Sequence, residues 1–121
     1  MLEVDNIADQ MEAGIYTWSV AEDRLYADTA IAALFGLDPS QTIGGLPLSS
    51  YIERVHLEDQ GQLAALIAKA VEDGQPYNAE YRVKNALNEY ELVMAVGRCF
   101  RDSTGTPTLY SGIVYPVQSL D

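Results

Sequence analysis

The clearest hydrophobic pattern in the chain lies between residues 57 and 73. Apolar side chains recur there at i, i+3, i+4, i+7 and i+8, the spacing of one face of an α-helix: Leu63, Leu66, Ile67, Ala70 and Val71. Gly74 follows, and glycine commonly ends a helix because it adopts left-handed backbone angles without strain. We therefore predict a helix over 57–73 with one face buried against another layer of the protein.

Strand-like stretches lie on both sides of this helix. Residues 15–20 and 24–27 are rich in aromatic and β-branched residues, and the short turn between them predicts a hairpin. Residues 76–85, 90–101 and 106–117 are three further strand candidates, joined by short polar connections of the kind found in tight turns. The sequence therefore predicts an α+β fold, a five-stranded antiparallel sheet with helices on one face.

Short helices are predicted between the hairpin and the long helix. Asp28 or Thr29 can cap a helix that Gly36 closes. A further helical turn begins at Asp38, and Ser49 or Ser50 precedes another short helix predicted over residues 51–55. These segments are expected to lie on the same face of the sheet as the long helix.

The first 13 residues carry a second amphipathic pattern. One side of a predicted helix is apolar, and acidic residues take the other sides; the apolar stripe consists of Val4, Ile7, Ala8 and Met11. A helix this short is not stable alone, so the stripe must pack on a surface, and we expect it to form a homodimer contact. The chain thus divides into an N-terminal helix (1–13), a main domain (14–117) and a tail (118–121).

Composition and charge narrow the classes of function. The chain has 121 residues, which fits one domain. Eighteen acidic residues against seven basic ones give a net charge of −11, which argues against binding nucleic acid or anionic membranes. One cysteine, no long apolar run and no signal-peptide pattern predict a cytoplasmic protein without an internal disulfide.

The sequence does not indicate machinery for catalysis. No Ser/His/Asp set is suggested by spacing, and no glycine-rich phosphate loop is present. A single cysteine rules out a multi-cysteine metal site. We therefore expect a protein that is not an enzyme and holds no metal.

A series of short motifs follows the predicted elements in order. They are Phe35-Gly36, His56-Leu57-Glu58-Asp59 at the start of the long helix, Glu80-Tyr81-Arg82, Gly97-Arg98, and the turn from Arg101 to Pro107. Each motif is weak alone, but together and in this order they resemble the PAS family of sensory domains. The resemblance covers roughly residues 14–117.

The resemblance implies a sensory or regulatory domain of bacterial signal transduction. Such a domain binds a small ligand between the long helix and the sheet and signals through dimerisation to an output module, here a histidine kinase or a diguanylate cyclase or phosphodiesterase. The candidate pocket residues are Leu63, Ile67, Val71, Tyr81, Val96 and Ile113. The alternative is a ligand-free interaction module that dimerises or docks an adaptor through the sheet face, because large side chains at this seam favour a filled core.

Two residues bear on the choice of cofactor. His56 starts the long helix, whereas haem-binding PAS domains place a histidine within it, so we expect His56 to cap the helix or bond Asp59. Cys99 falls in a predicted strand, where a free cysteine usually behaves as a small buried apolar residue. Nothing resembles the cysteine motif of flavin-binding relatives. Haem and flavin are therefore not expected, and the cofactor stays unknown.

Alternation along residues 76–85 divides the side chains of this strand between two faces. Glu80 and Arg82 fall on one face, which we expect to be the outer one, with a cross-strand ion pair to Arg98; the alternative is a role in an interface. The apolar alternates are expected to face the helices: Tyr77, Ala79, Tyr81 and Val83.

Overall fold

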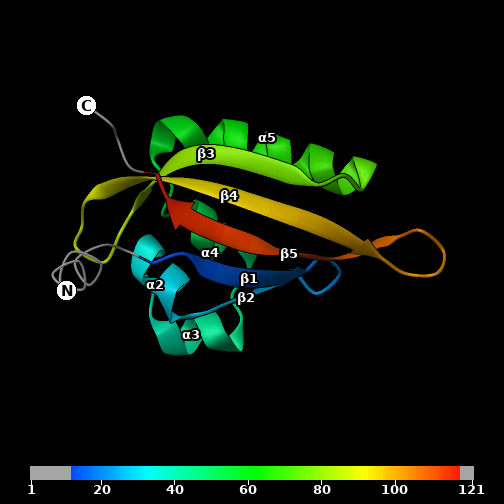
Figure 1. The fold of residues 1–121 in the computed structure, drawn as a ribbon, viewed down its shortest axis with the longest axis horizontal. Helices are drawn as coiled ribbons and strands as arrows, with labels where there is room; N and C mark the ends of the chain where they lie inside the picture. Colours follow the sequence, from blue (N-terminus) through cyan, green and yellow to red (C-terminus); the bar gives the residue numbers. More distant parts are fainter. Residues whose placement is uncertain (1–11, 118–121) are drawn as a thin grey trace, which may run out of the picture.

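Antiparallel pairings set the order of the strands. The computed structural model describes residues 12–117, and its strands are β1 (Gly14–Ser19), β2 (Arg24–Ala27), β3 (Tyr77–Lys84), β4 (Tyr90–Arg101) and β5 (Pro107–Pro116). They form a five-stranded sheet in the order β2-β1-β5-β4-β3, and every neighbouring pair is antiparallel (Figure 1). The predicted fold class is confirmed.

Helices fill the connection between the hairpin and the last three strands. They are α2 (Thr29–Phe35), α3 (Pro39–Gly44), α4 (Leu48–Ile52) and α5 (Leu57–Asp73). Asp28 begins α2 because its Oδ1 accepts a hydrogen bond from the backbone N–H of Ile31 at 3.1 Å. Gly36 and Gly74 end α2 and α5, each with a φ of 63°, which a residue with a side chain rarely adopts.

The helices and the sheet enclose the core between them. Figure 1 shows α5 running beside β3, α2 and α3 next to β1 and β2, and α4 behind the middle of the sheet. Ile31 and Leu34 of α2 and Val83 and Val93 of the sheet are at most 1% exposed. The buried face of the sheet is therefore the one that the helices cover.

The predicted N-terminal helix lies almost entirely outside the described residues. Its stripe (Val4, Ile7, Ala8 and Met11) falls within residues 1–11, and the tail over 118–121 is outside as well. Glu12 and Ala13 are described, and both are exposed and belong to no helix or strand. The helix and its dimer contact therefore stay predictions.

Two of the predicted pocket residues lie on the wrong face of the sheet. Val114 of β5 is buried beneath the helices, so its neighbour Ile113 points to the opposite face and is 38% exposed. Val96 pairs with Ile113 in the β4–β5 register and shares that outer face. The prediction that Val96 and Ile113 face the long helix is wrong.

Candidate functional site

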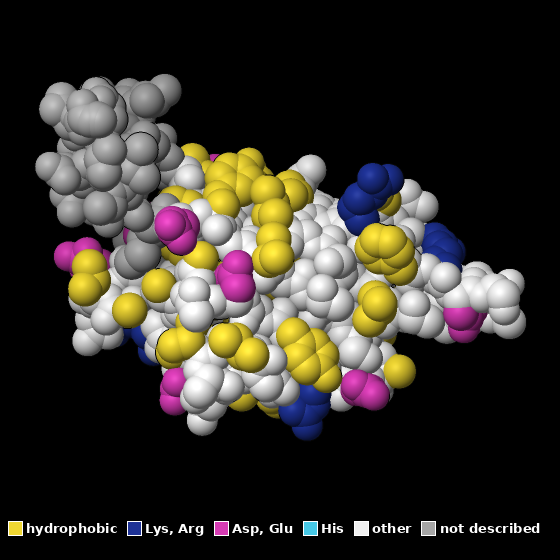
Figure 2. Space-filling model, turned by 60° about the horizontal axis from the view of Figure 1, so that its bottom comes forward, with side chains coloured by type: hydrophobic (Ala, Val, Ile, Leu, Met, Phe, Trp, Pro, Cys, Tyr) yellow, Lys and Arg dark blue, Asp and Glu magenta, His cyan; other side chains and the backbone are white. Residues whose placement is uncertain are grey.

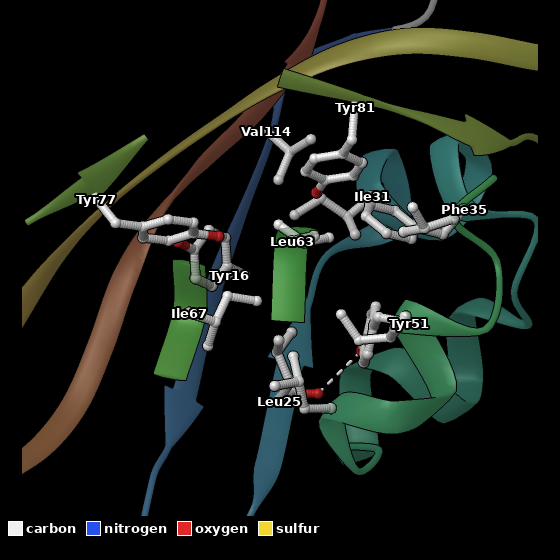
Figure 3. Close-up of a pocket in the computed structure, with 13 residues that line it drawn as sticks. Tyr16, Leu25, Ile31, Phe35, Tyr51, Leu63, Ile67, Tyr77, Tyr81 and Val114 are labelled. Atoms are coloured by element: carbon white, nitrogen blue, oxygen red, sulfur yellow. Dashed lines mark hydrogen bonds between the residues drawn. The ribbon is translucent and has the colours of Figure 1, made fainter. Parts of the chain in front are cut away.

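A small internal cavity lies between α5 and the sheet. Its volume is about 40 Å³, and it is lined by side chains from all the strands except β4 and from α2, α4 and α5. Figure 3 shows Leu63 and Ile67 of α5 converging with Tyr16, Tyr81 and other core side chains around this space. A void of about 10–15 Å³ already holds one water molecule, so this cavity has room for a few non-hydrogen atoms.

The predicted pocket residues divide into three groups. Leu63, Ile67 and Tyr81 line the cavity. Val71 lines a second void of about 20 Å³ farther along α5, which shares Ile67 with the first. Val96 and Ile113 instead line open clefts on the outer face of the sheet.

Much of the lining comes from elements that the sequence did not connect to the pocket. Tyr16 of β1, Phe35 of α2, Tyr51 of α4 and Val114 of β5 all contribute. A signal exists for two of them, because Tyr51 and Phe35 are aromatic residues within short apolar helices. The helices α2 and α4 close over the cavity because of tertiary packing, and a local sequence pattern cannot predict such packing.

Two of the lining tyrosines have their hydroxyl groups satisfied by backbone carbonyls. The Tyr51 hydroxyl donates to the carbonyl oxygen of Leu25 at 2.9 Å, which Figure 3 marks, and the Tyr16 hydroxyl donates to that of Val96 at 3.4 Å. Burial raises the pKa of Tyr51 to about 12 and that of Tyr16 further. Both groups therefore stay protonated at neutral pH and hold the hairpin and α4 in place.

Tyr81 differs from these two tyrosines. Its side chain is only 6% exposed, and in Figure 3 its hydroxyl points toward the interior of the group of lining residues. Burial raises its pKa well above the ordinary value, so the hydroxyl is a proton donor at neutral pH. Among residues 12–117 no hydrogen bond of the Tyr81 hydroxyl is found, and no fully buried side-chain oxygen lacks a partner there, so this hydroxyl keeps some access to solvent. A polar group that faces the cavity is thus free to bond a guest.

Arg82 forms its ion pairs with the first turn of α5. Asp59 accepts hydrogen bonds from the backbone N–H, Nε and Nη2 of Arg82 at 2.8–3.0 Å, and Glu58 lies 3.3 Å from Nη2. Arg82 forms no ion pair with Glu80, and Arg98 forms none with any described residue. The predicted cross-strand ion pair is therefore wrong, because α5 brings a closer carboxylate to the edge of β3.

His56 caps α5, which is one of the two roles expected of it. Its Nδ1 accepts a hydrogen bond from the backbone N–H of Glu58 at 3.1 Å, and the backbone N–H of His56 donates to the carbonyl oxygen of Arg82 at 2.8 Å. The imidazole ring also packs against Tyr90, with ring centroids 4.7 Å apart. His56 thus joins the start of the helix to the edge strand.

We expect Asp59→Asn to lower the free energy of unfolding at pH 7 and to make this free energy vary less between pH 4 and pH 2. The hydrogen bonds from Arg82 lower the pKa of Asp59 from 3.8 to about 2. A carboxyl with a lowered pKa stabilises the fold above pH 4, and this contribution is lost as pH falls toward 2. The substitution should cost about 1–2 kcal/mol at pH 7, since the pair is partly screened by solvent.

Urea unfolding between pH 7 and pH 2 measures this effect. Glu58→Gln is the matched control, because Glu58 has a 74% exposed side chain and a single, longer contact with Arg82. Its free energy of unfolding should stay within about 0.5 kcal/mol of the parent value. If Asp59→Asn and Glu58→Gln lowered the free energy of unfolding equally, Asp59 would not be the main stabilising partner of Arg82.

Cys99 is half-buried, whereas the sequence predicts a buried side chain. It lies on β4, and its Sγ is 3.8 Å from the carbonyl oxygen of Phe100.

Among residues 12–117 no cluster of His, Cys, Asp and Glu could hold a metal ion. In the same part of the chain, no helix has the length and apolar character needed to cross a membrane.

Comparisons with known proteins agree with the observed fold. The family described as the PAS fold matches residues 24–114. The N-terminal domain of a diguanylate cyclase with PAS/PAC sensor from Marinobacter aquaeolei is 22% identical, with a TM-score of 0.78 over 87% of this chain and 94% of that one. No curated protein matches the chain.

Other solved structures share the fold at lower identity. A sensory box histidine kinase/response regulator from Burkholderia thailandensis is 18% identical, with a TM-score of 0.72 over 97% of this chain and 85% of that one. The PAS-B domain of Drosophila melanogaster Cycle with bound ethylene glycol is also 18% identical, with a TM-score of 0.66 over 86% and 99%. The sheet order, the helices on one face and the match over residues 24–114 lead to one conclusion: the chain belongs to the PAS family.

Proposed function

We propose that this chain is a non-catalytic sensory domain of bacterial cytoplasmic signalling, and that it detects a small molecule in the cavity beside α5. The observation that carries the proposal is the free hydroxyl of Tyr81 facing that cavity. No fully buried side-chain oxygen or nitrogen lacks a partner among the described residues, so a guest that accepts a hydrogen bond from Tyr81 gains about the 0.5–1.5 kcal/mol of an ordinary net hydrogen bond. Apolar contacts with Leu63 and Ile67 supply the rest of the affinity.

The size of the cavity limits the chemistry of the ligand. Drug-sized ligands occupy pockets of roughly 300–1,000 Å³, whereas this cavity holds about 40 Å³. The ligand should therefore be a compact, mostly apolar molecule with one hydrogen-bond acceptor, such as a short alcohol or ketone. Haem and flavin are far too large for this space.

Binding would be reported through the packing of α5. A ligand shifts an equilibrium only by its difference in affinity for two arrangements. Leu63 and Ile67 contact the cavity from α5, so occupancy favours the arrangement in which this helix stands slightly farther from the sheet. We propose that a homodimer passes this change to an output module, either a histidine kinase or a diguanylate cyclase or phosphodiesterase.

A ligand-free interaction module is the second candidate. The small volume of the cavity favours it, because close packing leaves little space for a guest. The exposed apolar side chains on the outer face of the sheet favour it as well, including Ile15 at 62% and Phe100 at 54% exposure. In this case the protein would dimerise or dock an adaptor through that face.

Native mass spectrometry of the purified chain, beside its denatured mass and its absorption spectrum, tests the first proposal. A non-covalent extra mass supports the sensor and identifies the chemical class of its ligand. If the chain carries no extra mass, isopropanol, acetone and ethylene glycol serve as probes, and NMR shifts of the Leu63 and Ile67 methyl groups report binding. A chain that binds none of them contradicts the sensor and favours the interaction module.

We expect Tyr81→Phe to weaken binding of such a probe about fivefold, because the guest loses one hydrogen bond worth roughly 1 kcal/mol. Tyr51→Phe is the matched control, since the Tyr51 hydroxyl is already bonded to Leu25. It should lower stability by about 1 kcal/mol and leave probe affinity unchanged. Equal probe affinity in the Tyr81→Phe variant and the parent would show that Tyr81 does not bond the guest.

A further inference from the structure

The first half of β3 is an open edge of the sheet. β3 pairs with β4 on one side only, and successive residues of an antiparallel strand direct their backbone groups to opposite sides. The backbone N–H of Arg82 donates to Asp59 and its carbonyl oxygen accepts from His56, so the backbone groups of Arg82 point away from β4. By the same alternation, Asn78 and Glu80 direct their N–H and C=O groups to this outer side. A further strand can pair with these groups.

The open edge is short because the structure closes it at both ends. Toward the end of β3, the backbone N–H of Lys84 donates to the carbonyl oxygen of Arg54 at 2.9 Å. Toward its start, Pro76 has no N–H to offer. Within residues 12–117 no hydrogen bond from outside the sheet reaches the backbone of Asn78 or Glu80. Two N–H and two C=O groups are therefore free, enough to pair a segment of about three residues.

A groove of about 240 Å³ opens between this edge and α5. Gln62 and Leu66 line it from α5, and Asn78 and Glu80 line it from β3. A paired strand lies about 4.8 Å from its neighbour, and its side chains alternate between the two faces of the sheet. One side chain of an added segment would thus point toward the half-buried Leu66, and the next would point to the opposite face, where Glu80 lies.

The charges around the groove favour a basic segment. Glu80 is exposed and forms no ion pair within residues 12–117. At the start of α5, Glu58 and Asp59 share a single cation, Arg82. Three carboxylates against one guanidinium make this end of the groove negative, and the net charge of −11 on the chain adds to the attraction for a basic partner.

We propose that this edge binds an extended, basic segment of a partner protein, which adds a strand to the sheet beside β3. Asn78 and Glu80 bond the backbone of the segment, one apolar side chain packs on Leu66, and the next, basic side chain pairs with Glu80. The edge offers fixed backbone groups, whereas the exposed hydrophobic side chains in Figure 2 lie in separate groups divided by polar surface. The proposal does not depend on a ligand in the cavity.

A second copy of the chain suits this edge less well than a basic segment does. Pairing two β3 edges would bring a second Glu80 to the groove. It would also bring together two chains that each carry a net charge of −11, which is repulsive. Charge complementarity therefore selects a different protein as the partner.

NMR titration of the isotope-labelled full chain with a hexapeptide of alternating valine and lysine, blocked at both ends, tests the proposal. The backbone amide resonances of Asn78 and Glu80 should move downfield, and the exchange of these amides with deuterated solvent should slow. The same peptide with N-methyl groups on its internal amides keeps its charge but cannot pair as a strand. A peptide of alternating valine and glutamate can pair but has the opposite charge. Both controls should bind at least fivefold more weakly.

A charge reversal on β3 provides a second readout. Glu80→Lys should weaken binding of the lysine peptide about fivefold, the size expected for one exposed ion pair. Glu22→Lys is the matched control, because the exposed Glu22 lies in the turn between β1 and β2, and β2 forms the opposite edge of the sheet. This variant should keep the parent affinity within about twofold.

Three outcomes would overturn the proposal. The first is equal binding of the N-methylated and unmodified lysine peptides, which would indicate attraction by charge alone. The second is a set of peptide-induced shifts that lies away from β3, or equal effects of the two substitutions. The third is movement of the Asn78 and Glu80 amides with protein concentration alone, which would identify a second copy as the occupant. The hexapeptide is far larger than the cavity of about 40 Å³, so none of these outcomes bears on the sensor proposal.

Discussion

Replacing Gly112 with alanine should remove at least about 4 kcal/mol of folding stability, a loss that only severe defects of the core produce. A Cβ atom at this position would collide with the carbonyl oxygen of Val96 and lie 2.7 Å from the Cα of Gly97. These atoms belong to the backbone of the paired strand, so no side-chain rotation relieves the contact. Urea unfolding followed by circular dichroism measures the loss.

Gly61→Ala is the matched control for this substitution. A Cβ atom at Gly61 would meet nothing within 4 Å, and the residue lies inside α5. Alanine is favoured over glycine within a helix by about 0.5–1 kcal/mol, so this variant should be more stable than the parent. If Gly112→Ala matched the parent in stability, the pairing of Gly97 with Gly112 between β4 and β5 would be wrong.

The elements that the sequence predicts best are those whose signals are local. The helix over 57–73 has a sustained apolar period and a terminal glycine, and α5 spans those residues as predicted. β2 and β4 also have their predicted bounds. Periodicity, caps and turn residues act within a few positions of one another, so one sequence is enough to place them.

The assignment of side chains to faces fails where both faces of a strand are apolar. Ile113 and Val114 are adjacent and equally apolar, as are Ala95 and Val96, so alternation gives no direction. The inward position is decided by which residue meets the helices. Because the outer face is apolar too, alternation does not show which residues face the helices, and the prediction for Val96 and Ile113 was wrong for this reason.

Ion pairs depend on distances that no local pattern contains. Glu80, Arg82 and Arg98 looked like partners because they fall on neighbouring strands. The start of α5 instead brings Asp59 within 2.8 Å of Arg82. The motif that includes Asp59 and the motif that includes Arg82 thus form one joint between helix and edge strand, although 23 residues separate them in the chain.

Leu63→Ala should lower the free energy of unfolding by about 2–5 kcal/mol and create a binding site for a small aromatic molecule. Leu63 is 5% exposed and contributes to the lining of the cavity from α5. Its truncation joins new space to the existing cavity, and apolar cavities of sufficient size bind benzene. Saturating benzene should then raise the melting temperature of the variant and leave that of the parent unchanged.

Leu66→Ala supplies the comparison that gives this experiment its meaning. Leu66 is only half-buried and lines a groove at the edge of β3 instead of the cavity. Leu66→Ala should therefore lower the free energy of unfolding less than Leu63→Ala does, and benzene should not change its melting temperature. If Leu63→Ala gains benzene binding while the parent binds none of the small probes, the native core is filled and the interaction module is favoured. If the parent binds the probes and the variant shifts its preference to larger guests, Leu63 sets the size of the ligand. A loss below about 1 kcal/mol for Leu63→Ala would mean that α5 collapses onto the sheet, and the cavity would then be too adaptable to select a ligand by size.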